Sequence, residues 1–224
     1  METIPKNKSN VQAVLSASYD YNTVLSNVVF RPILFNSLMV HALLDGRKTQ
    51  TRRIVKDELL QKYKDRESEI VDFMKVTMVD SKKPKIGEIL WVRESFIQKD
   101  NRIIYRSPVW SKNDLPDGYK WKPSFFMPKS ACRLFLKIMN IRLERLYDIS
   151  EQDAINEGIL SGASPYTYQK YRNYMQYGGH TELTAKDSYK SLWINFNGQE
   201  SWDDNPFIWV YDFEVSLDCP PGFR

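Results

Sequence analysis

The segment Leu44-Asp45-Gly46-Arg47-Lys48-Thr49-Gln50-Thr51-Arg52-Arg53 organises the rest of this chain. An apolar helical pattern precedes the segment and a hydrophobic run begins at Ile54, so its cations and hydroxyls lie where one element ends and another begins. Gly46 can take a positive φ and end the helix. Binding and catalytic groups are common at such junctions.

The spacing of the segment restricts which side chains can meet. On a straight strand Lys48 and Thr51 point to opposite faces, because the side-chain period is two. They converge only if the chain turns between them, and Gly46 makes such a turn plausible. Thr51 and Arg53 share a face once the strand begins. We therefore predict that Lys48, Thr51 and Arg53 line one pocket and that Arg52 points the other way.

The pattern Gly46-x-Lys48-x-x-Thr51-x-Arg53 resembles the signature of the ASCH superfamily, relatives of the PUA RNA-binding fold. Many members have glutamate where this chain has Thr51, and the threonine form resembles the bacterial acetylcytidine amidohydrolase branch. Three later segments resemble phage-encoded and prophage-encoded members: Gly87 to Ser95, Lys122-Pro123-Ser124, and Trp202-Asp203-x-Asn205-Pro206. The resemblance covers roughly residues 31–215.

The resemblance implies hydrolysis of the acetyl amide on the exocyclic amine of acetylcytidine. In that branch a lysine and a threonine three residues later work with a glutamate further along, and we assign these roles to Lys48, Thr51 and Glu94. Thr51, or a water that it positions, would attack the acetyl carbonyl. Lys48 would be the base and Glu94 would hold Lys48 or polarise the water, although Glu94 as the base stays open. Arg53 would stabilise the oxyanion or hold a phosphate or ribose.

Glu94 also has a purely structural interpretation. Alternation along the predicted strand places it on the same face as Leu90, Val92 and Phe96. A carboxylate on a buried face needs a cationic partner. The pattern is therefore compatible with a buried Glu–Arg or Glu–Lys pair as well as with a catalytic carboxylate.

Further cations and aromatics are candidates for contacts with substrate or nucleic acid. Arg52 and Arg53 belong to this set, and Trp91 and Trp121 are residue types that stack on bases. Core packing and surface coverage are the alternatives for the tryptophans and for the remaining two candidates, which are Arg93 and Lys122. The PUA relationship keeps open a non-catalytic RNA- or nucleotide-binding module, and nuclease activity by the same pocket is a third, less supported interpretation.

Composition limits the other possibilities. The net charge of the 224 residues is only +4, so contact with RNA or a modified nucleotide requires a local basic patch. Two cysteines without motif spacing indicate a reducing cytoplasm. The resemblance to phage-encoded and prophage-encoded members implies that the protein is encoded by a bacterial host or by a phage. No cofactor and no metal site are predicted, and no apolar run approaches membrane-spanning length. Oligomeric state is not determined.

The chain is predicted to be one α+β domain, a small mixed β-barrel of the PUA-like type flanked by a few helices. The barrel is implied by the ASCH resemblance, because strand count alone does not separate a barrel from an open sheet. The predicted organisation is an N-terminal arm (1–29), a domain (30–217) with insertions near 57–80 and 161–183, and a C-terminal tail (218–224). The main predicted strands are 31–35, 88–98, 132–146 with a bend at Asn140, and 207–215.

Overall fold

The computed structural model describes residues 28–55, 83–99, 102–107, 115, 119–164, 167–175 and 180–223. The predicted insertion near 57–80 lies outside these residues, and so does the predicted arm, apart from Val28 and Val29.

The described residues form an α+β fold, as predicted. The helices are α2 (Ser37–Leu44), α5 (Glu151–Asn156), α6 (Ala185–Asn197) and α7 (Gln199–Asp203). The strands are β1 (Phe30–Leu34), β2 (Gln50–Ile54), β3 (Ile89–Arg93), β4 (Phe96–Lys99), β5 (Arg102–Tyr105), β6 (Phe135–Arg145), β7 (Ser161–Ser164), β8 (Thr167–Arg172), β9 (His180–Glu182) and β10 (Phe207–Ser216).

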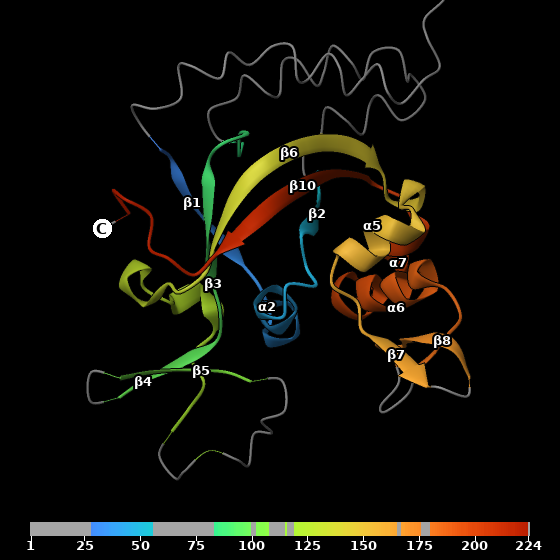
Figure 1. Cartoon of the computed structure of the whole chain (residues 1–224), viewed down its shortest axis with the longest axis horizontal. Coiled ribbons are helices and arrows are strands. Elements are labelled where there is room, and N and C mark those ends of the chain that lie inside the picture. The colour runs from blue at the N-terminus through green and yellow to red at the C-terminus, as the bar shows by residue number, and fades with distance from the viewer. Residues whose placement is uncertain are drawn as a thin grey trace, which may run out of the picture.

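The main sheet has five strands in the order β1-β3-β6-β10-β2. β1 runs parallel to β3, and the other neighbours are antiparallel. β6 and β10 are long and curve across the molecule (Figure 1). Among the described strands the hydrogen-bonded order is open at β1 and β2, but Arg53 on β2 reaches across and donates from Nη2 to the Leu34 carbonyl at 3.2 Å.

A β-bulge increases the curvature of β6. Asp212 pairs with Asn140 and Phe213 pairs with Ile138, so Met139 is the extra residue. A bulge bends the strand that carries it and increases its twist. The predicted irregularity at Asn140 is confirmed.

The predicted strand 88–98 is two strands in two sheets. β3 belongs to the main sheet, whereas β4 pairs with β5 in a hairpin. Glu94 and Ser95 lie at the break, where the Glu94 amide donates to Met127 Sδ at 3.2 Å instead of to a strand neighbour. Uninterrupted alternation in the sequence concealed this change of sheet.

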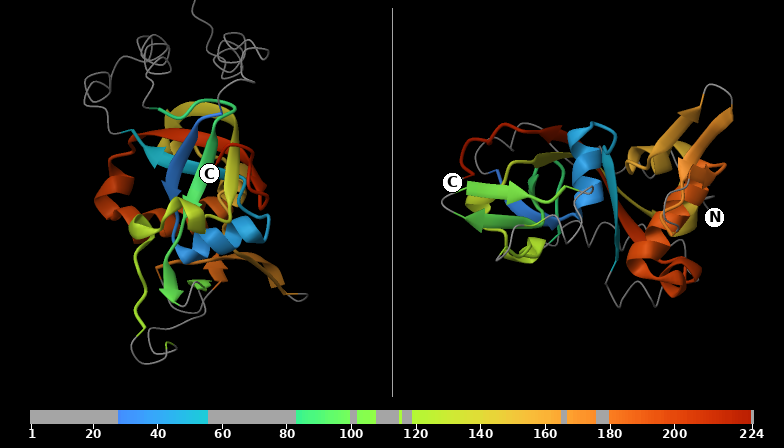
Figure 2. Two further views of the ribbon diagram at one scale, coloured as in Figure 1. Left: turned by 90° about the vertical axis from the view of Figure 1, so that its left-hand side faces the viewer. Right: turned by 90° about the horizontal axis from the view of Figure 1, so that it is seen from below.

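The predicted insertion near 161–183 contains a small sheet rather than only a loop. β8 lies between β7 and β9 and pairs antiparallel with both. This sheet packs beside α6 on the side of the molecule away from β4 and β5, and α2 lies between these two regions (Figures 1 and 2).

Local sequence signals explain how the helices begin. Asn36 caps α2 by accepting from the Met39 amide, and Ser150 with Asp153 forms a capping box on α5. Thr184 caps α6, because its side chain accepts from the Asp187 amide. The stripe Tyr189, Leu192 and Trp193 then faces the core.

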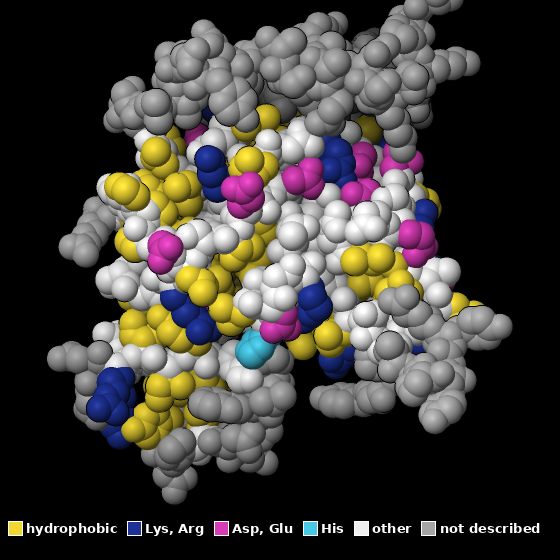
Figure 3. All heavy atoms as spheres, in the orientation of Figure 1, with side chains coloured by type: hydrophobic (Ala, Val, Ile, Leu, Met, Phe, Trp, Pro, Cys, Tyr) yellow, Lys and Arg dark blue, Asp and Glu magenta, His cyan; other side chains and the backbone are white. Residues whose placement is uncertain are grey.

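The tail folds back onto the body, because Phe223 packs edge-to-face against Trp91 and Phe135. Elsewhere on the surface, acidic and basic side chains lie next to one another over β6 and β10 (Figure 3). In the described part of the chain no helix is long and apolar enough to cross a membrane.

Candidate functional site

The chain reverses after α2, as the sequence predicted. Asp45 caps the helix, and Gly46 takes a φ of +70°. The Lys48 amide then returns to the Ala42 carbonyl at 2.9 Å, and the Thr49 amide bonds the Asn156 carbonyl at 2.9 Å. Lys48 is therefore fixed between the end of α2 and the end of α5 before β2 begins.

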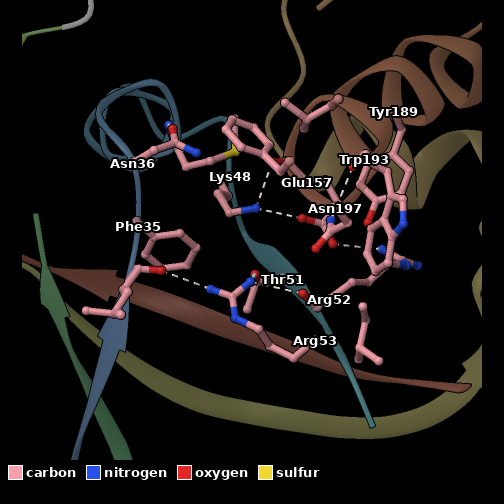
Figure 4. A pocket seen from close by; sticks show the side chains of 15 residues that line it. Phe35, Asn36, Lys48, Thr51, Arg52, Arg53, Glu157, Tyr189, Trp193 and Asn197 are labelled. Carbon is pink, nitrogen blue, oxygen red and sulfur yellow. Dashed lines mark hydrogen bonds and ion pairs between the residues drawn. The ribbon is translucent and has the colours of Figure 1, made fainter. Parts of the chain in front are cut away.

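This reversal opens onto a cavity of about 440 Å³. Its walls come from the end of β1 and the start of α2, from β2, from the residue after α5, and from α6 (Figure 4). Lys48, Thr51 and Arg53 all line it, which confirms the predicted grouping. The complete lining is Leu34, Phe35, Asn36, Met39, Lys48, Thr51, Arg52, Arg53, Ile54, Glu157, Tyr189, Leu192, Trp193, Phe196 and Asn197.

Lys48 is only 1% exposed, although it is a lysine. Its Nζ donates to Glu157 Oε2 at 2.6 Å and to the Glu157 carbonyl at 2.9 Å. Burial lowers the pKa of Lys48, and the cations Arg53 and Arg52 act in the same direction, while Glu157 opposes them. A neutral amine, which can accept a proton, is therefore more accessible here than in a solvated lysine.

Gly158 allows Glu157 and Lys48 to approach so closely. It has a φ of +86°, and a Cβ at this position would lie 2.8 Å from the Cβ atoms of both Ala42 and Lys48. Lys48 and Glu157 also form an isolated antiparallel bridge. Only glycine satisfies both the backbone angle and the lack of space.

Arg52 does not occupy the role predicted for it. It was expected to point away from the pocket and to contact substrate or nucleic acid, yet it lines the cavity wall with a fully enclosed side chain. Its guanidinium bonds Glu157 Oε1 at 3.1 Å and Glu144 Oε1 at 2.7 Å. Burial acts to lower the pKa of Arg52, but Glu157, Tyr189 and Glu144 outweigh it and the pKa is raised. Arg52 is thus a permanent cation that holds Glu157.

A second layer of charges lies behind Arg52. Arg142 lies on β6 and bonds Glu144 on the same strand at 3.1 Å. It also bonds Asp153 on α5 at 2.6 Å and Asp212 on β10 at 2.9 Å, so it joins β6 to α5 and to β10. Gln50 bonds Asp153 as well, at 3.1 Å. Because each carboxylate has a cationic or amide partner, the layer fixes α5, and with it Glu157, on the sheet.

Thr51 and Arg53 form a pair on the β2 wall of the cavity. Arg53 Nη1 donates to Thr51 Oγ1 at 2.8 Å, and its guanidinium lies over the Phe35 ring at 5.0 Å. Thr51 is 1% exposed. In Figure 4, Thr51 and Arg53 lie on the same side of Lys48 as Phe35, whereas Glu157 lies toward Trp193.

Glu94 is not part of this site, which corrects its assignment to the catalytic set. Its two carboxylate oxygens accept from Arg133 Nε at 2.8 Å and Nη2 at 2.9 Å. It lies at the break between β3 and β4, and the glutamate that contacts Lys48 is Glu157. The structural interpretation of Glu94 as half of a buried Glu–Arg pair is the one that the geometry supports.

The four other predicted contact residues lie outside the cavity lining. Trp91 packs on the tail residue Phe223, and Arg93 covers the Trp91 ring at 5.3 Å. Lys122 pairs with Phe96 through a backbone bridge, and Trp121 lies under Arg106 at 6.0 Å. Core packing and surface coverage, the alternatives raised from the sequence, describe these residues better than base stacking in this cavity.

Sequence reasoning missed Glu157 as a site residue. A signal was present in the sequence, because Glu157 directly precedes Gly158, and glycine is the residue that most often ends a helix. Asn36, which caps α2, and Trp193, in the core-facing stripe of α6, also line the cavity. Asn197 also lines the cavity, and the sequence carried no signal for it.

Comparison with known proteins adds little to this geometry. No protein-family model matches the chain, and no solved structure matches it. One curated protein, the mitochondrial ATPase synthesis protein 25 of Debaryomyces hansenii, is 28% identical over 138 residues. The match covers 59% of this chain, which spans about one fifth (21%) of the length of that relative.

Proposed function

We propose that this protein is an ASCH-type amidohydrolase that removes the acetyl group from acetylcytidine, with Lys48, Thr51 and Glu157 as its catalytic residues. The observation that carries the proposal is a buried lysine with a lowered pKa at the wall of a cavity that it shares with a threonine and a glutamate. The resemblance in the segment around Lys48 supplies the reaction, and Glu157 takes the place first assigned to Glu94.

The proposed first step is acyl transfer to Thr51. Neutral Lys48 takes the hydroxyl proton of Thr51, and Oγ1 attacks the acetyl carbon. The resulting tetrahedral intermediate collapses when Lys48 returns that proton to the exocyclic nitrogen, so the C–N bond breaks and cytidine leaves. Water then hydrolyses the acetyl ester, which releases acetate and restores the Thr51 hydroxyl.

Two cations support this chemistry from different sides. Arg53, 2.8 Å from Thr51 Oγ1, stabilises the negative charge that develops on the attacking oxygen and on the acetyl oxygen. Arg52 holds Glu157 through Oε1 and leaves Oε2 to Lys48. Glu157 thereby orients the amine and stabilises its protonated form after proton transfer.

The same contacts argue against a phosphate-binding role for this segment. Arg52 has no exposed side-chain surface, and Arg53 is partly buried and bonds Thr51, the Arg52 carbonyl and Leu34. Sequence-independent binding to a nucleic-acid backbone needs cations that reach solvent. A small modified nucleoside therefore fits the cavity better than an RNA backbone does. We place the reaction in a bacterial or phage-infected cytoplasm, in keeping with the free cysteines Cys132 and Cys219.

The test is to incubate purified protein with acetylcytidine and to measure the cytidine and acetate formed. We expect turnover, and we expect Lys48→Ala and Thr51→Ala each to reduce it by about a hundredfold or more, on the order of 3 kcal/mol. Intact-protein mass spectrometry after rapid quenching should detect one added acetyl group on wild type and none on Thr51→Ala.

Wild-type rates in either variant would reject the assignment. The matched control is Thr184→Ser, a conservative change at a helix cap outside the cavity lining, which should leave turnover unchanged. If no deacetylation occurs, and RNA binds with an affinity that falls steeply as salt rises, the protein is instead a binding module.

A further inference from the structure

Two asparagines at the cavity have amide groups whose orientation is fixed by the backbone. Asn36 Oδ1 accepts from the Met39 amide at 2.9 Å, and Asn197 Nδ2 donates to the Trp193 carbonyl at 3.2 Å. A backbone N–H requires an oxygen opposite it and a carbonyl requires an N–H donor, so neither amide can be flipped without losing its bond.

It is therefore known whether the second polar atom of each amide is a donor or an acceptor. Asn36 keeps an Nδ2 donor and Asn197 keeps an Oδ1 acceptor, and neither atom is hydrogen-bonded to another group within the described part of the chain. Both residues line the cavity. In Figure 4, Asn36 lies on the side of Phe35, whereas Asn197 lies on the side of Trp193, near Glu157.

We propose that Asn36 and Asn197 select the substrate by its hydrogen-bonding edge: the Asn36 amide donates to a ring carbonyl or ring nitrogen, and the Asn197 carbonyl accepts from the exocyclic N–H of the acylated amine. This inference rests on the proposed function and deepens it. The ligand class is a single-ring nitrogen heterocycle that has an acceptor and a secondary amide N–H on one edge, as acetylcytidine does.

The surroundings of the two asparagines suit such a ligand. Trp193 and Phe196 provide flat apolar surface against which a planar ring can lie. Asn197 lies on the same side of the cavity as Glu157, which holds the Lys48 amine. A cavity of about 440 Å³ is within the size range of small-molecule sites.

The Asn36 arm of the test uses substitutions that keep the helix cap. Serine also caps helices but lacks the amide donor, so Asn36→Ser should raise KM for acetylcytidine about tenfold with a smaller change in kcat. Asn36→Asp keeps the cap and replaces the donor by a charged acceptor, so its KM should rise further. Asn173→Ser is the matched control, because Asn173 Oδ1 also accepts from a backbone amide, that of Met175, outside the cavity lining, and its KM should not change.

The Asn197 arm compares two ligands. Acetylcytidine methylated on the exocyclic nitrogen has no N–H, and wild type should bind it about tenfold more weakly than acetylcytidine in ligand-observed NMR titrations. Asn197→Leu should bind both ligands with similar affinity, whereas Asn197→Asp, which still accepts, should keep the preference. Melting temperatures establish that each variant is folded.

The two readouts separate this inference from the proposed function. Turnover with unchanged KM in Asn36→Ser and unchanged ligand preference in Asn197→Leu would overturn the inference and leave the function standing. Binding of acetylcytidine that depends on both asparagines, without turnover, would support the inference and overturn the function. No binding of acetylcytidine to wild type would overturn the inference.

Discussion

Glu94 and Glu157 are both buried glutamates paired with cations, and they differ in how the pairing is made. Glu94 gives both oxygens to one guanidinium, that of Arg133, in a bidentate pair. Glu157 divides its oxygens between Lys48 and Arg52, and its backbone carbonyl also binds Lys48. In the Glu94–Arg133 pair no group is available to exchange a proton with a substrate. The Glu157 cluster includes the Lys48 amine, which can change its protonation state.

The surroundings of Glu94 and Glu157 also differ. Glu94 lies where β3 ends, with Met127 on one side and Arg133 on the other. Glu157 lies at the wall of a cavity that Lys48, Thr51 and Arg53 also line. The comparison teaches that burial and a salt bridge do not identify a catalytic carboxylate. Access to a cavity and a titratable partner with a perturbed pKa are better criteria.

The largest expected effect compares the two glutamates directly. Glu157→Gln should lower kcat/KM for acetylcytidine by about a hundredfold, on the order of 3 kcal/mol, because it removes the charge that orients Lys48. Glu94→Gln should keep most of the activity, because Glu94 lies outside the cavity lining. Equal losses in the two variants, measured on folded protein, would remove the distinction between the sites.

Gly158 should be the most sensitive structural position next to Glu157. Gly158→Ala should lower the free energy of unfolding by about 2–3 kcal/mol, because the new Cβ has a strained φ and clashes with Ala42 and Lys48. Gly46→Ala, with a φ of +70° but no atom within 4 Å, should cost only about 1 kcal/mol. Chemical denaturation of both variants measures the difference, and equal costs would show that the close approach is unimportant.

The Glu94–Arg133 pair should matter for stability rather than for turnover. Glu94→Gln should lower the free energy of unfolding by about 1–2 kcal/mol, because one charged partner is lost. The cost is limited because 35% of the Arg133 side chain is exposed, so its charge can be solvated. Urea titration measures it, and no destabilisation would mean that the pair contributes nothing net.

The smallest expected effect is a displacement of the pH profile. A base is active when neutral, so activity should rise with pH through the pKa of Lys48, which lies below that of a solvated lysine. Arg53 lowers this pKa, so Arg53→Gln should move the rising limb of kcat/KM to higher pH. Glu157 raises it, so the residual activity of Glu157→Gln should rise at lower pH.

Arg31→Gln provides the control for these profiles, because Arg31 pairs with Glu88 outside this cavity. Its rising limb should coincide with that of wild type. If Arg53→Gln and Glu157→Gln shifted the limb in the same direction, Lys48 would not be the titrating group.

The sequence by itself determined what is local. Gly46 after an apolar stripe specified the reversal, Asn36 and Ser150 specified helix starts, and the period of two placed Thr51 and Arg53 on one face. These outcomes depend on φ preferences, on capping and on side-chain alternation, which act over a few residues. For this reason the sequence could predict that Lys48, Thr51 and Arg53 line one cavity.

Only the tertiary structure decided which carboxylate Lys48 contacts. Glu157 is 109 residues away in the sequence, and its contact with Lys48 depends on α5 docking on the sheet through Arg52, Arg142 and a glycine without a side chain. Glu94 was the plausible choice because alternation marked it as buried, yet the chain changes sheets beside it. Pairing between distant charges depends on the position of whole elements, and no local preference encodes that position.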